Sequence, residues 1–186
     1  INTLHEEFFS DGKKQINLFI AGVGTVGSKL LDQIQQQSEY IAENLGLNLR
    51  VVGIANSKKF IINEEGIDLA KWQNLLNNQP ANETETMVGK MVALQSLIDT
   101  IIEKNLRNSI FVDVTADSNI AELFYPKLLE KSISIVACNK VAASSEYEFY
   151  QYLKDKAREY NTNFLFETNV GAGLPIINTL NDLRSS

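Results

Sequence analysis

Histidine and cysteine are nearly absent from this sequence, and each scarcity excludes a class of chemistry. The one histidine, His5, lies in an irregular N-terminal stretch, so we set aside Ser-His-Asp catalysis and histidine-based metal sites. The one cysteine, Cys138, cannot form an internal disulfide. A chain with so little cysteine is typical of a reducing compartment, and we expect a cytoplasmic protein.

Long apolar runs and an excess of positive charge are also missing. No apolar stretch approaches the roughly 18 residues that a membrane-spanning helix needs, and no signal peptide is visible. The net charge is −6 at pH 7, which disfavours general binding to nucleic acid or to an anionic membrane. Any site for an anion must therefore be built locally.

The amounts of apolar and charged residues are ordinary. Of the 186 residues, 44% are hydrophobic and 22% are charged, which fits one globular domain with a sizeable core. The chain begins with Ile1 instead of Met and ends at "NDLRSS", a pattern like that of an interrupted helix. From both ends we expect a piece of a longer polypeptide.

Strand and helix patterns alternate along the chain. Apolar runs predict strands at 16–21, 47–55, 109–115, 132–137 and 163–167. Helical periodicity predicts a first helix in which "QQQSEY" allows a bend, then helices near 69–76, 91–102, 120–129 and 147–160. The residues near one apolar face of the first helix are Val26, Leu30, Ile34, Ile41 and Leu45. This alternation indicates an α/β fold, a Rossmann-type doubly wound and mostly parallel sheet with helices on both faces.

Function is expected just after the strands, because ligands of such sheets bind beyond the carboxyl ends of the strands. The segments at these positions are "GVGTVG" (22–27), "NSKK" (56–59), "TADS" (115–118), "CNK" (138–140) and "TNVGAGLP" (168–175).

The first of these segments has the glycine spacing G-x-G-x-x-G between a strand and a helix. Gly22 permits a tight turn, Gly24 lets a pyrophosphate approach the backbone, and Gly27 lets the helix pack on the strand. The helix N-terminus then favours an anion. We interpret the segment as a dinucleotide site; the alternatives are a structural turn or a site for another nucleotide.

The second strand lacks the acidic residue that usually binds the ribose of NAD. It ends in Ala55 and Asn56, followed by Ser57, Lys58 and Lys59. Asn56 can hydrogen-bond the ribose, and Ser57 and the lysines can accommodate a 2′-phosphate. This favours NADP over NAD, although the same lysines would also suit a solvated loop.

The ends of the third and fourth long strands carry further candidates. Thr115 can bond the nicotinamide ribose or a phosphate, and Asp113 is either part of that site or a residue that bonds neighbouring backbone. Lys140 follows a buried strand, where its ammonium group can bind a phosphate, a carboxylate or a carbonyl oxygen; the alternative is a surface lysine. Cys138 is interpreted as a buried structural thiol.

The last segment, "ETNVGAGLP" (167–175), is rich in glycine where a strand meets a helix. Backbone carbonyls and the Glu167 carboxylate suit a hard cation there. On the residues alone, a plain turn with Pro175 near the start of a helix explains the segment better.

Together these motifs resemble homoserine dehydrogenase. The resemblance rests on "GVGTVG" (22–27), "GIANSK" (53–58), "VDVT" (112–115), "ACNK" (137–140) and, most specifically, "ETNVGAGLP" (167–175). It implies NAD(P)-linked interconversion of homoserine and aspartate 4-semialdehyde, on the route to threonine and methionine. The cofactor contacts that it implies are Val23, Gly24, Thr25, Val26, Asn56, Thr115, Ala116 and Lys140.

The resemblance also implies a bound monovalent cation and a longer protein. The cation, usually sodium, would be held by the Glu167 region and by the backbone oxygens of Val170, Ala172 and Leu174. Residues 1–15 are similar to the linker after the kinase half of bifunctional aspartokinase–homoserine dehydrogenases. We therefore expect a linker (1–15), a dinucleotide-binding domain (16–175) and the start of a substrate or dimerisation region (176–186), with a homo-oligomer in the full-length protein.

Two departures and one absence qualify the resemblance. "ACNK" stands where the family often has T-P-N-K or T-A-N-K, and Ala116 stands where serine is common. The family's substrate domain, with the catalytic lysine and the acidic residues that hold homoserine, follows the "GAGLP" block and is not in this chain. The alternatives to the cofactor half of this enzyme are a nucleotide-sensing Rossmann domain, a dehydrogenase of another small amino-acid-derived aldehyde, and a structural module.

Overall fold

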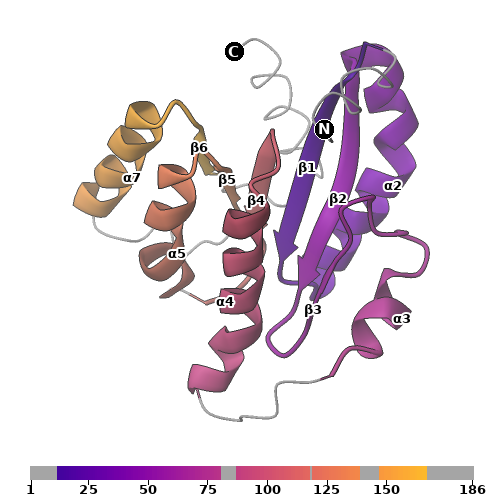
Figure 1. Cartoon of the computed structure of the whole chain (residues 1–186), viewed down its shortest axis with the longest axis horizontal. Helices are drawn as coiled ribbons and strands as arrows, with labels where there is room; N and C mark the ends of the chain where they lie inside the picture. The colour runs from indigo at the N-terminus through magenta and orange to yellow at the C-terminus, as the bar shows by residue number, and fades with distance from the viewer. Residues whose placement is uncertain (1–11, 81–86, 118, 139–146, 167–186) are drawn as a thin grey trace.

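A twisted six-stranded sheet forms the centre of the computed structural model, which describes residues 12–80, 87–117, 119–138 and 147–166 (Figure 1). The strands lie in the order β3-β2-β1-β4-β5-β6. All neighbouring pairs are parallel except β2 and β3, which form an antiparallel hairpin. The strands are β1 (Lys14–Ala21), β2 (Leu47–Ala55), β3 (Phe60–Ile62), β4 (Ser109–Asp113), β5 (Ser134–Ala137) and β6 (Phe164–Phe166).

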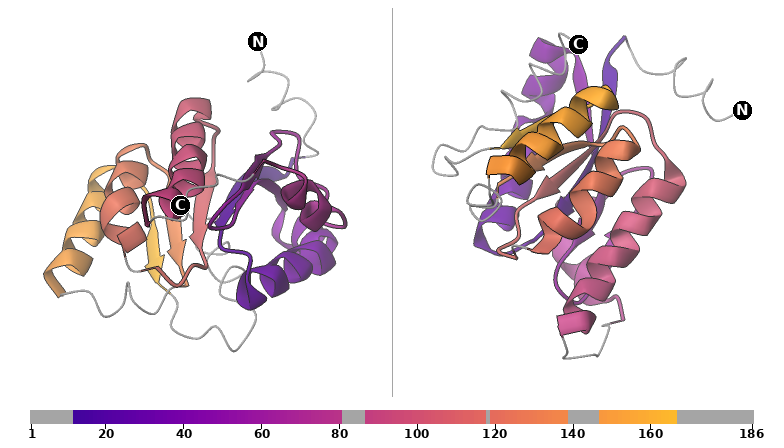
Figure 2. Two further views of the ribbon diagram at one scale, coloured as in Figure 1. Left: turned by 90° about the horizontal axis from the view of Figure 1, so that it is seen from below. Right: turned by 90° about the vertical axis from the view of Figure 1, so that its left-hand side faces the viewer.

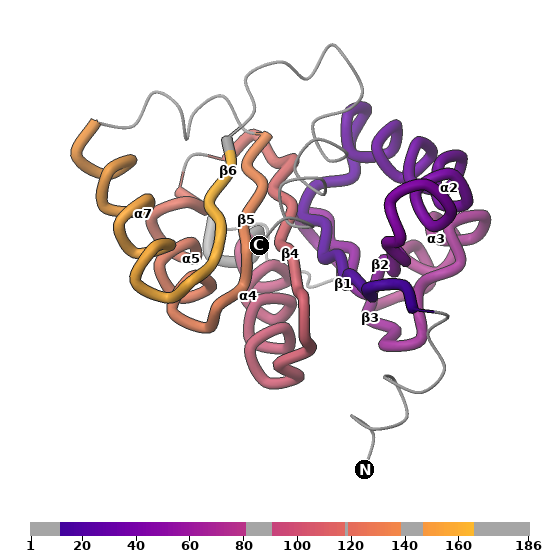
Figure 3. The backbone as a smooth tube through the Cα atoms, turned by 90° about the horizontal axis from the view of Figure 1, so that it is seen from above, coloured from indigo at the N-terminus to yellow at the C-terminus, as the bar shows by residue number. Residues whose placement is uncertain are grey.

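Helices cover both faces of the sheet. On one face lie α2 and α3, and on the other lie α4, α5 and α7, as the two views of Figure 2 and the trace of Figure 3 show. This arrangement confirms the predicted doubly wound α/β fold. The helices are α2 (Thr25–Leu45), α3 (Trp72–Asn77), α4 (Met87–Lys104), α5 (Asn119–Glu130) and α7 (Tyr147–Glu159).

The central strand β1 shows why the strands are continuously apolar. Leu18 and Ile20 pack with α2 and α3, whereas Phe19 and Ala21 pack with the helices of the opposite face. All four side chains are at most 1% exposed. Because alternate side chains of a strand point to opposite faces, a sheet covered on both sides needs apolar residues at every position.

Gly53 on β2 allows α4 to approach the sheet closely. A methyl group at this position would lie 2.7 Å from Phe19 Cδ1, 3.0 Å from Leu97 Cδ1 and 3.1 Å from Ile62 Cδ1. The register of β1 against β2 also shifts by one residue just before Gly53, between the pairs formed by Leu18 and Phe19. The glycine therefore serves packing at this point of the sheet.

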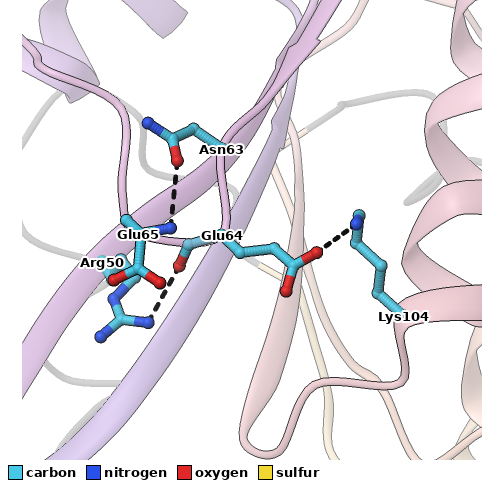
Figure 4. A network of polar contacts seen from close by, with 5 residues as sticks. All are labelled: Arg50, Asn63, Glu64, Glu65 and Lys104. Carbon is cyan, nitrogen blue, oxygen red and sulfur yellow. Dashed lines mark hydrogen bonds and ion pairs between the residues drawn. The ribbon is translucent and has the colours of Figure 1, made fainter.

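Polar contacts fix the far end of the β2–β3 hairpin, on the side of the sheet where β4 begins. Arg50 on β2 donates from Nη1 to the backbone oxygen of Glu64 at 2.9 Å, and Lys104 at the end of α4 forms an ion pair with the Glu64 carboxylate (Figure 4). Asn63 Oδ1 accepts a hydrogen bond from the backbone N–H of Glu65 at 3.1 Å. These contacts join the hairpin to β2 and α4, away from the strand ends that are expected to bind ligand.

Two details differ from the sequence-based expectations. The edge strand β3 lies in a segment predicted to be irregular. Val26 was expected on the apolar face of α2, but its side chain is 45% exposed, whereas Ile34 and Ile41 are buried as predicted. The helix is continuous through "QQQSEY", where a bend was left open.

Candidate functional site

The carboxyl ends of five strands lie at one level of the sheet. Ala21 pairs with Ala55 on one side and with Asp113 on the other, and Asp113 pairs in turn with Ala137. Ala137 continues the row to β6. The last residues of these strands therefore lie side by side at one edge of the sheet.

The chain reverses its winding between β1 and β4. From β1 it passes to α2 on one face, and from β4 it passes to α5 on the other face. Ligands of open α/β sheets bind at such a point, because the two connections diverge and leave a crevice between the strand ends. The glycine-rich segment lies at this point.

Gly22 forms the tight turn after β1. Its φ of +96° is strained for any residue with a side chain, and a Cβ there would lie 2.7 Å from the Val114 backbone oxygen and 2.9 Å from the Thr115 nitrogen. Its N–H donates to the Ala55 oxygen at 2.9 Å. Gly22 thus lets the turn lie directly against the backbone that follows β4.

Gly27 and Gly24 differ sharply in what surrounds them. A Cβ at Gly27 would lie 2.0 Å from the Gly22 backbone oxygen, so α2 can approach the end of β1 only with glycine here. A Cβ at Gly24 would have no heavy atom within 4 Å, and the backbone there has φ of −69°. Neither strain nor packing requires glycine at this position, and the open space beside it is where a pyrophosphate would lie.

The N-terminus of α2 faces this open space without a side-chain cap. Gly24 is the N-cap residue, and the first turn contains no acidic residue, so nothing within the helix neutralises the partial positive charge of its N–H groups. Thr25 and Val26 are exposed, and the Ser28 hydroxyl donates to the Val23 backbone oxygen at 3.0 Å. The backbone amides of this turn are therefore held in place and can bind an anion.

Asn56 shapes the turn between β2 and β3. Its Oδ1 accepts hydrogen bonds from the backbone N–H groups of Lys58 at 2.8 Å and of Lys59 at 2.7 Å, and its own N–H donates to the Lys59 oxygen at 2.9 Å. The side-chain oxygen is thus used within the turn. The amide nitrogen Nδ2 remains the group of Asn56 that suits a ribose oxygen.

The two lysines of this turn have different environments. Lys59 donates from Nζ to the backbone oxygen of Asn77 at 2.5 Å, and so joins the turn to the end of α3. Lys58 and Ser57 are exposed at the tip of the turn. Of the two lysines, Lys58 is the one placed to approach a phosphate, and Lys59 has a structural role.

Asp113 is buried at the end of β4 and organises the residues beside it. It is 1% exposed and accepts three hydrogen bonds: at Oδ1 from the Thr115 N–H (2.9 Å) and the Thr115 hydroxyl (2.6 Å), and at Oδ2 from the Tyr125 hydroxyl (2.6 Å). The interpretation of Asp113 as a residue that bonds neighbouring backbone is thereby confirmed. Thr115 itself is half-buried, and Ala116 beside it is exposed.

Burial sets the charge states within this group. Burial raises the pKa of the Asp113 carboxyl above its ordinary value, and the hydrogen bonds from Thr115 and Tyr125 oppose that rise. Burial, together with the charge of Asp113, raises the pKa of the Tyr125 hydroxyl well above its usual range. Tyr125 therefore remains a hydrogen-bond donor at neutral pH.

Tyr125 was not singled out from the sequence. The available signal was its place on the buried face of a predicted helix, because a buried tyrosine usually finds a partner for its hydroxyl. The identity of that partner could not be predicted, since Asp113 and Tyr125 lie on different elements. Their contact depends on how α5 packs against β4.

Several predicted site residues lie outside the described part of the chain. Lys140 is one of them, and the cation ligands Glu167, Val170, Ala172 and Leu174 are the others. Cys138, the last described residue before Lys140, is half-buried, and its N–H donates to the backbone oxygen of Asp113 at 2.8 Å. Among the described residues, no group of three or more histidine, cysteine, aspartate or glutamate side chains could hold a metal ion.

A separate groove of about 530 Å³ lies between β3 and α3. It shares only Lys59 with the strand-end residues discussed above, so it is distinct from the site proposed around the glycine turn. The groove is lined by Lys59, Phe60, Ile61, Ile62, Asn63, Ile67, Leu75, Gln79 and Pro80.

None of the helices in the described ranges is long and apolar enough to cross a membrane.

Comparison with known proteins gives consistent matches in sequence. The family profile described as homoserine dehydrogenase, NAD binding domain, matches residues 22–167. The bifunctional aspartokinase/homoserine dehydrogenase of Haemophilus influenzae is 33% identical over 186 residues, which is all of this chain and 21% of that protein. The homoserine dehydrogenase of Schizosaccharomyces pombe is 34% identical over 177 residues, covering 94% of this chain and 44% of that protein.

A solved structure gives a match in three dimensions. A hyperthermophilic archaeal homoserine dehydrogenase in complex with NADPH has a TM-score of 0.62 and 25% identity, covering 89% of this chain and 47% of that one. The chain thus spans about a fifth of the length of the bifunctional relative and less than half of the other two proteins.

Proposed function

The chain belongs to the homoserine dehydrogenase family, whose NAD-binding domain it spans, and from this premise we propose that it is the cofactor-binding part of an oxidoreductase that interconverts L-homoserine and L-aspartate 4-semialdehyde. One observation carries the proposal. Gly24 caps the 21-residue helix α2 with no side chain of its own, and a Cβ there would meet only open space. This space fits a pyrophosphate beside the backbone amides.

In this proposal, different residues around the glycine turn contact different parts of NAD(P). Val23, Gly24, Thr25 and Val26 present backbone N–H groups and an exposed apolar side chain to the pyrophosphate side. Thr115 lies against Gly22 beyond the end of β4, Ala116 follows it in the chain, and both border the opposite side of the proposed site. When bound, the nicotinamide ring supplies the carbon that accepts or gives up the hydride.

NADP is the preferred cofactor in this proposal. No carboxylate follows β2, so nothing there repels a 2′-phosphate, and Lys58 and Ser57 are exposed at the tip of the turn. Asn56 contributes its Nδ2 to the ribose, because its Oδ1 is used by the turn. The solved archaeal relative contains NADPH, which supports the same preference.

Lys140 and the segment after β6 complete the proposed site. In this proposal Lys140, two residues after Cys138 in the sequence, serves the nicotinamide end of the cofactor. There its ammonium group would bind the substrate or the cofactor. A sodium ion held by Glu167 and by the backbone oxygens of Val170, Ala172 and Leu174 is part of the proposal, as is a homo-oligomer in the full-length protein.

A domain exchange tests the proposed function. The cofactor domain of the Schizosaccharomyces pombe homoserine dehydrogenase is replaced by the present chain, and homoserine-dependent reduction of NADP is measured. We expect activity from the hybrid and none from the same hybrid with Gly24→Val, because a branched side chain would occupy the space of the pyrophosphate. A folded hybrid that binds NADPH without oxidising homoserine would support a nucleotide-sensing domain instead.

A further inference from the structure

A chain of hydrogen bonds through the buried Asp113 runs from α5 to the glycine turn. The Tyr125 hydroxyl, fully buried, donates to Asp113 Oδ2 at 2.6 Å, and the Thr115 hydroxyl donates to Asp113 Oδ1 at 2.6 Å. The Thr115 N–H donates to the same Oδ1 at 2.9 Å. The carboxylate thereby collects three donors, and Thr115 is the member of the group that borders the glycine turn.

This arrangement fixes which way the Thr115 hydroxyl points. A hydroxyl has one proton and two lone pairs, and the proton of Thr115 is directed inward to Asp113. The lone pairs therefore remain for a ligand in the crevice. An oxygen of this kind accepts a hydrogen bond from a sugar hydroxyl and is poorly suited to a phosphate oxygen, which is itself only an acceptor.

We propose that Tyr125 is a positioning residue for the cofactor, which acts through Asp113 to hold the Thr115 hydroxyl as an acceptor for a ribose hydroxyl of the dinucleotide. The inference rests on the proposed dinucleotide binding. Tyr125 touches neither the cofactor nor the substrate in this account. Its hydroxyl stabilises the charged form of Asp113, and the charged form orients Thr115.

The orientation of Thr115 depends on the charge of Asp113. A protonated carboxyl is a weaker acceptor than a carboxylate, so it holds the Thr115 proton less firmly. Among the described residues, the titratable groups around Asp113 are Asp117 on the same loop, Tyr125 on α5 and Cys138 directly after β5. Asp117 raises the pKa of Asp113, and the Tyr125 hydrogen bond lowers it. Dinucleotide binding should therefore weaken as the pH falls through the pKa of Asp113, and loss of the Tyr125 hydroxyl should move that change to higher pH.

The first test compares Tyr125→Phe with Tyr150→Phe. Both rings pack near Phe164, with centroids 5.8 Å and 6.0 Å away, but only Tyr125 bonds Asp113. The dissociation constant of NADH is measured from about pH 5 to about pH 9, because NADH lacks the 2′-phosphate that titrates near pH 6. Tyr125→Phe should weaken binding about three- to tenfold and shift the acidic loss of binding to higher pH, and Tyr150→Phe should do neither.

A double-mutant cycle tests whether Tyr125 affects cofactor binding through Thr115. In a Thr115→Val background, Tyr125→Phe should have no further effect on the dissociation constant, since the acceptor that it positions is gone. An equal loss in both backgrounds, or a loss without a change in the pH profile, would overturn the inference. Thermal melting of each variant shows whether it is folded.

Two further variants keep the test decisive if Tyr125→Phe does not fold. Asp113→Asn retains the shape of the side chain but cannot titrate, so its weaker binding should not change with pH over the acidic range. Thr115→Val, which removes the acceptor itself, should bind NADH about three- to tenfold more weakly than the wild type. Wild-type affinity in Thr115→Val would overturn the inference alone, whereas no NADH or NADPH binding by the wild type would overturn the proposed function and the inference with it.

Discussion

At the scale of single residues, two neighbouring lysines of equal charge have different surroundings and different expected roles. Lys58 is exposed at the tip of the β2–β3 turn, while Lys59 bonds the end of α3. Lys58→Ala should weaken NADPH binding by about 1–2 kcal/mol and leave NADH binding unchanged, because only NADPH has the 2′-phosphate. Calorimetric titration with both cofactors measures this difference.

The matched change Lys59→Ala serves as the control for Lys58→Ala. It should lower the melting temperature more than it lowers the preference for NADPH, since it removes a bond between two elements. An equal loss of affinity for NADPH and NADH in Lys58→Ala would contradict the assignment of Lys58 to the phosphate.

Asp113 should also make the stability of the chain depend on pH. Its pKa in the folded chain is raised, so the folded state holds a proton more tightly than the unfolded state, whose pKa is about 3.9. The contribution of Asp113 to stability is therefore present below about pH 4 and is lost as the pH rises through the folded pKa. Urea unfolding of the wild type and of Asp113→Asn over this range measures the effect.

The quantity that tests this prediction is the difference in unfolding free energy between the wild type and Asp113→Asn, followed as the pH changes. The stability of the wild type relative to Asp113→Asn should decrease as the pH rises above about 4 and then become constant. A relative stability that increases over this range would mean that the hydrogen bonds to Asp113 outweigh its burial, contrary to the raised pKa.

The sequence predicted the roles of residues best where the backbone conformation requires a particular residue type. The three glycines of the fingerprint were assigned separate roles, and the geometry at Gly22, Gly24 and Gly27 fits each role. The use of Asn56 Oδ1 within its own turn was not predicted, because it depends on a tight antiparallel hairpin that the sequence did not indicate. The cofactor contacts of these residues stay predictions.

At the scale of elements, the long apolar runs were predicted well and the short edge strand was not. The range 47–55 was predicted for β2 and is the range observed. The strand β3 has only three residues, after two lysines, and is held by its pairing with β2 instead of by a periodic pattern of its own. Such pairing is a property of the folded sheet, and no local signal in 56–90 specifies it.

Gly53 tests how tightly α4 packs on the sheet. In Gly53→Ala the added methyl group would press on Phe19, Leu97 and Ile62, so we expect a loss of about 1–3 kcal/mol in unfolding free energy. Gly46→Ala is a useful comparison, because Gly46 has φ of +64° and open space around it, and its cost comes from backbone strain alone. Urea unfolding curves of both variants would measure these costs.

Combining each glycine change with Leu97→Ala separates the two mechanisms. The smaller side chain should relieve part of the Gly53→Ala cost and none of the Gly46→Ala cost. No relief at Gly53 would mean that α4 is not what limits the size of this residue.

At the scale of the whole molecule, the part of the chain that the structure describes has the features of a cofactor domain and shows little that could hold an amino acid. Its strand ends offer the glycine turn, Asn56, Lys58 and Thr115, and all of these suit a dinucleotide. Turnover also requires a group that takes the alcohol proton and groups that hold the amino acid, and a misplaced substrate forfeits much of an orientation advantage of roughly 7–11 kcal/mol. We therefore expect the 186-residue chain to bind NADP without oxidising homoserine.

Reduction of NADP in the presence of homoserine, compared with a full-length relative as the positive control, checks this expectation. Clear turnover by the chain would show that the catalytic groups lie within it. It would then be wrong to place them in the substrate domain that the family carries after its "GAGLP" block.

The most direct test of the central claim is calorimetric titration of NADPH into the wild type, Gly24→Val and Gln36→Val. Gly24 faces the open space at the start of α2, while Gln36 is exposed further along the same helix. We expect the wild type and Gln36→Val to bind one NADPH with similar affinity. We also expect Gly24→Val to remain folded and to bind none. Undiminished binding by Gly24→Val, or no binding by the wild type, would contradict the assignment of the glycine turn as the dinucleotide site.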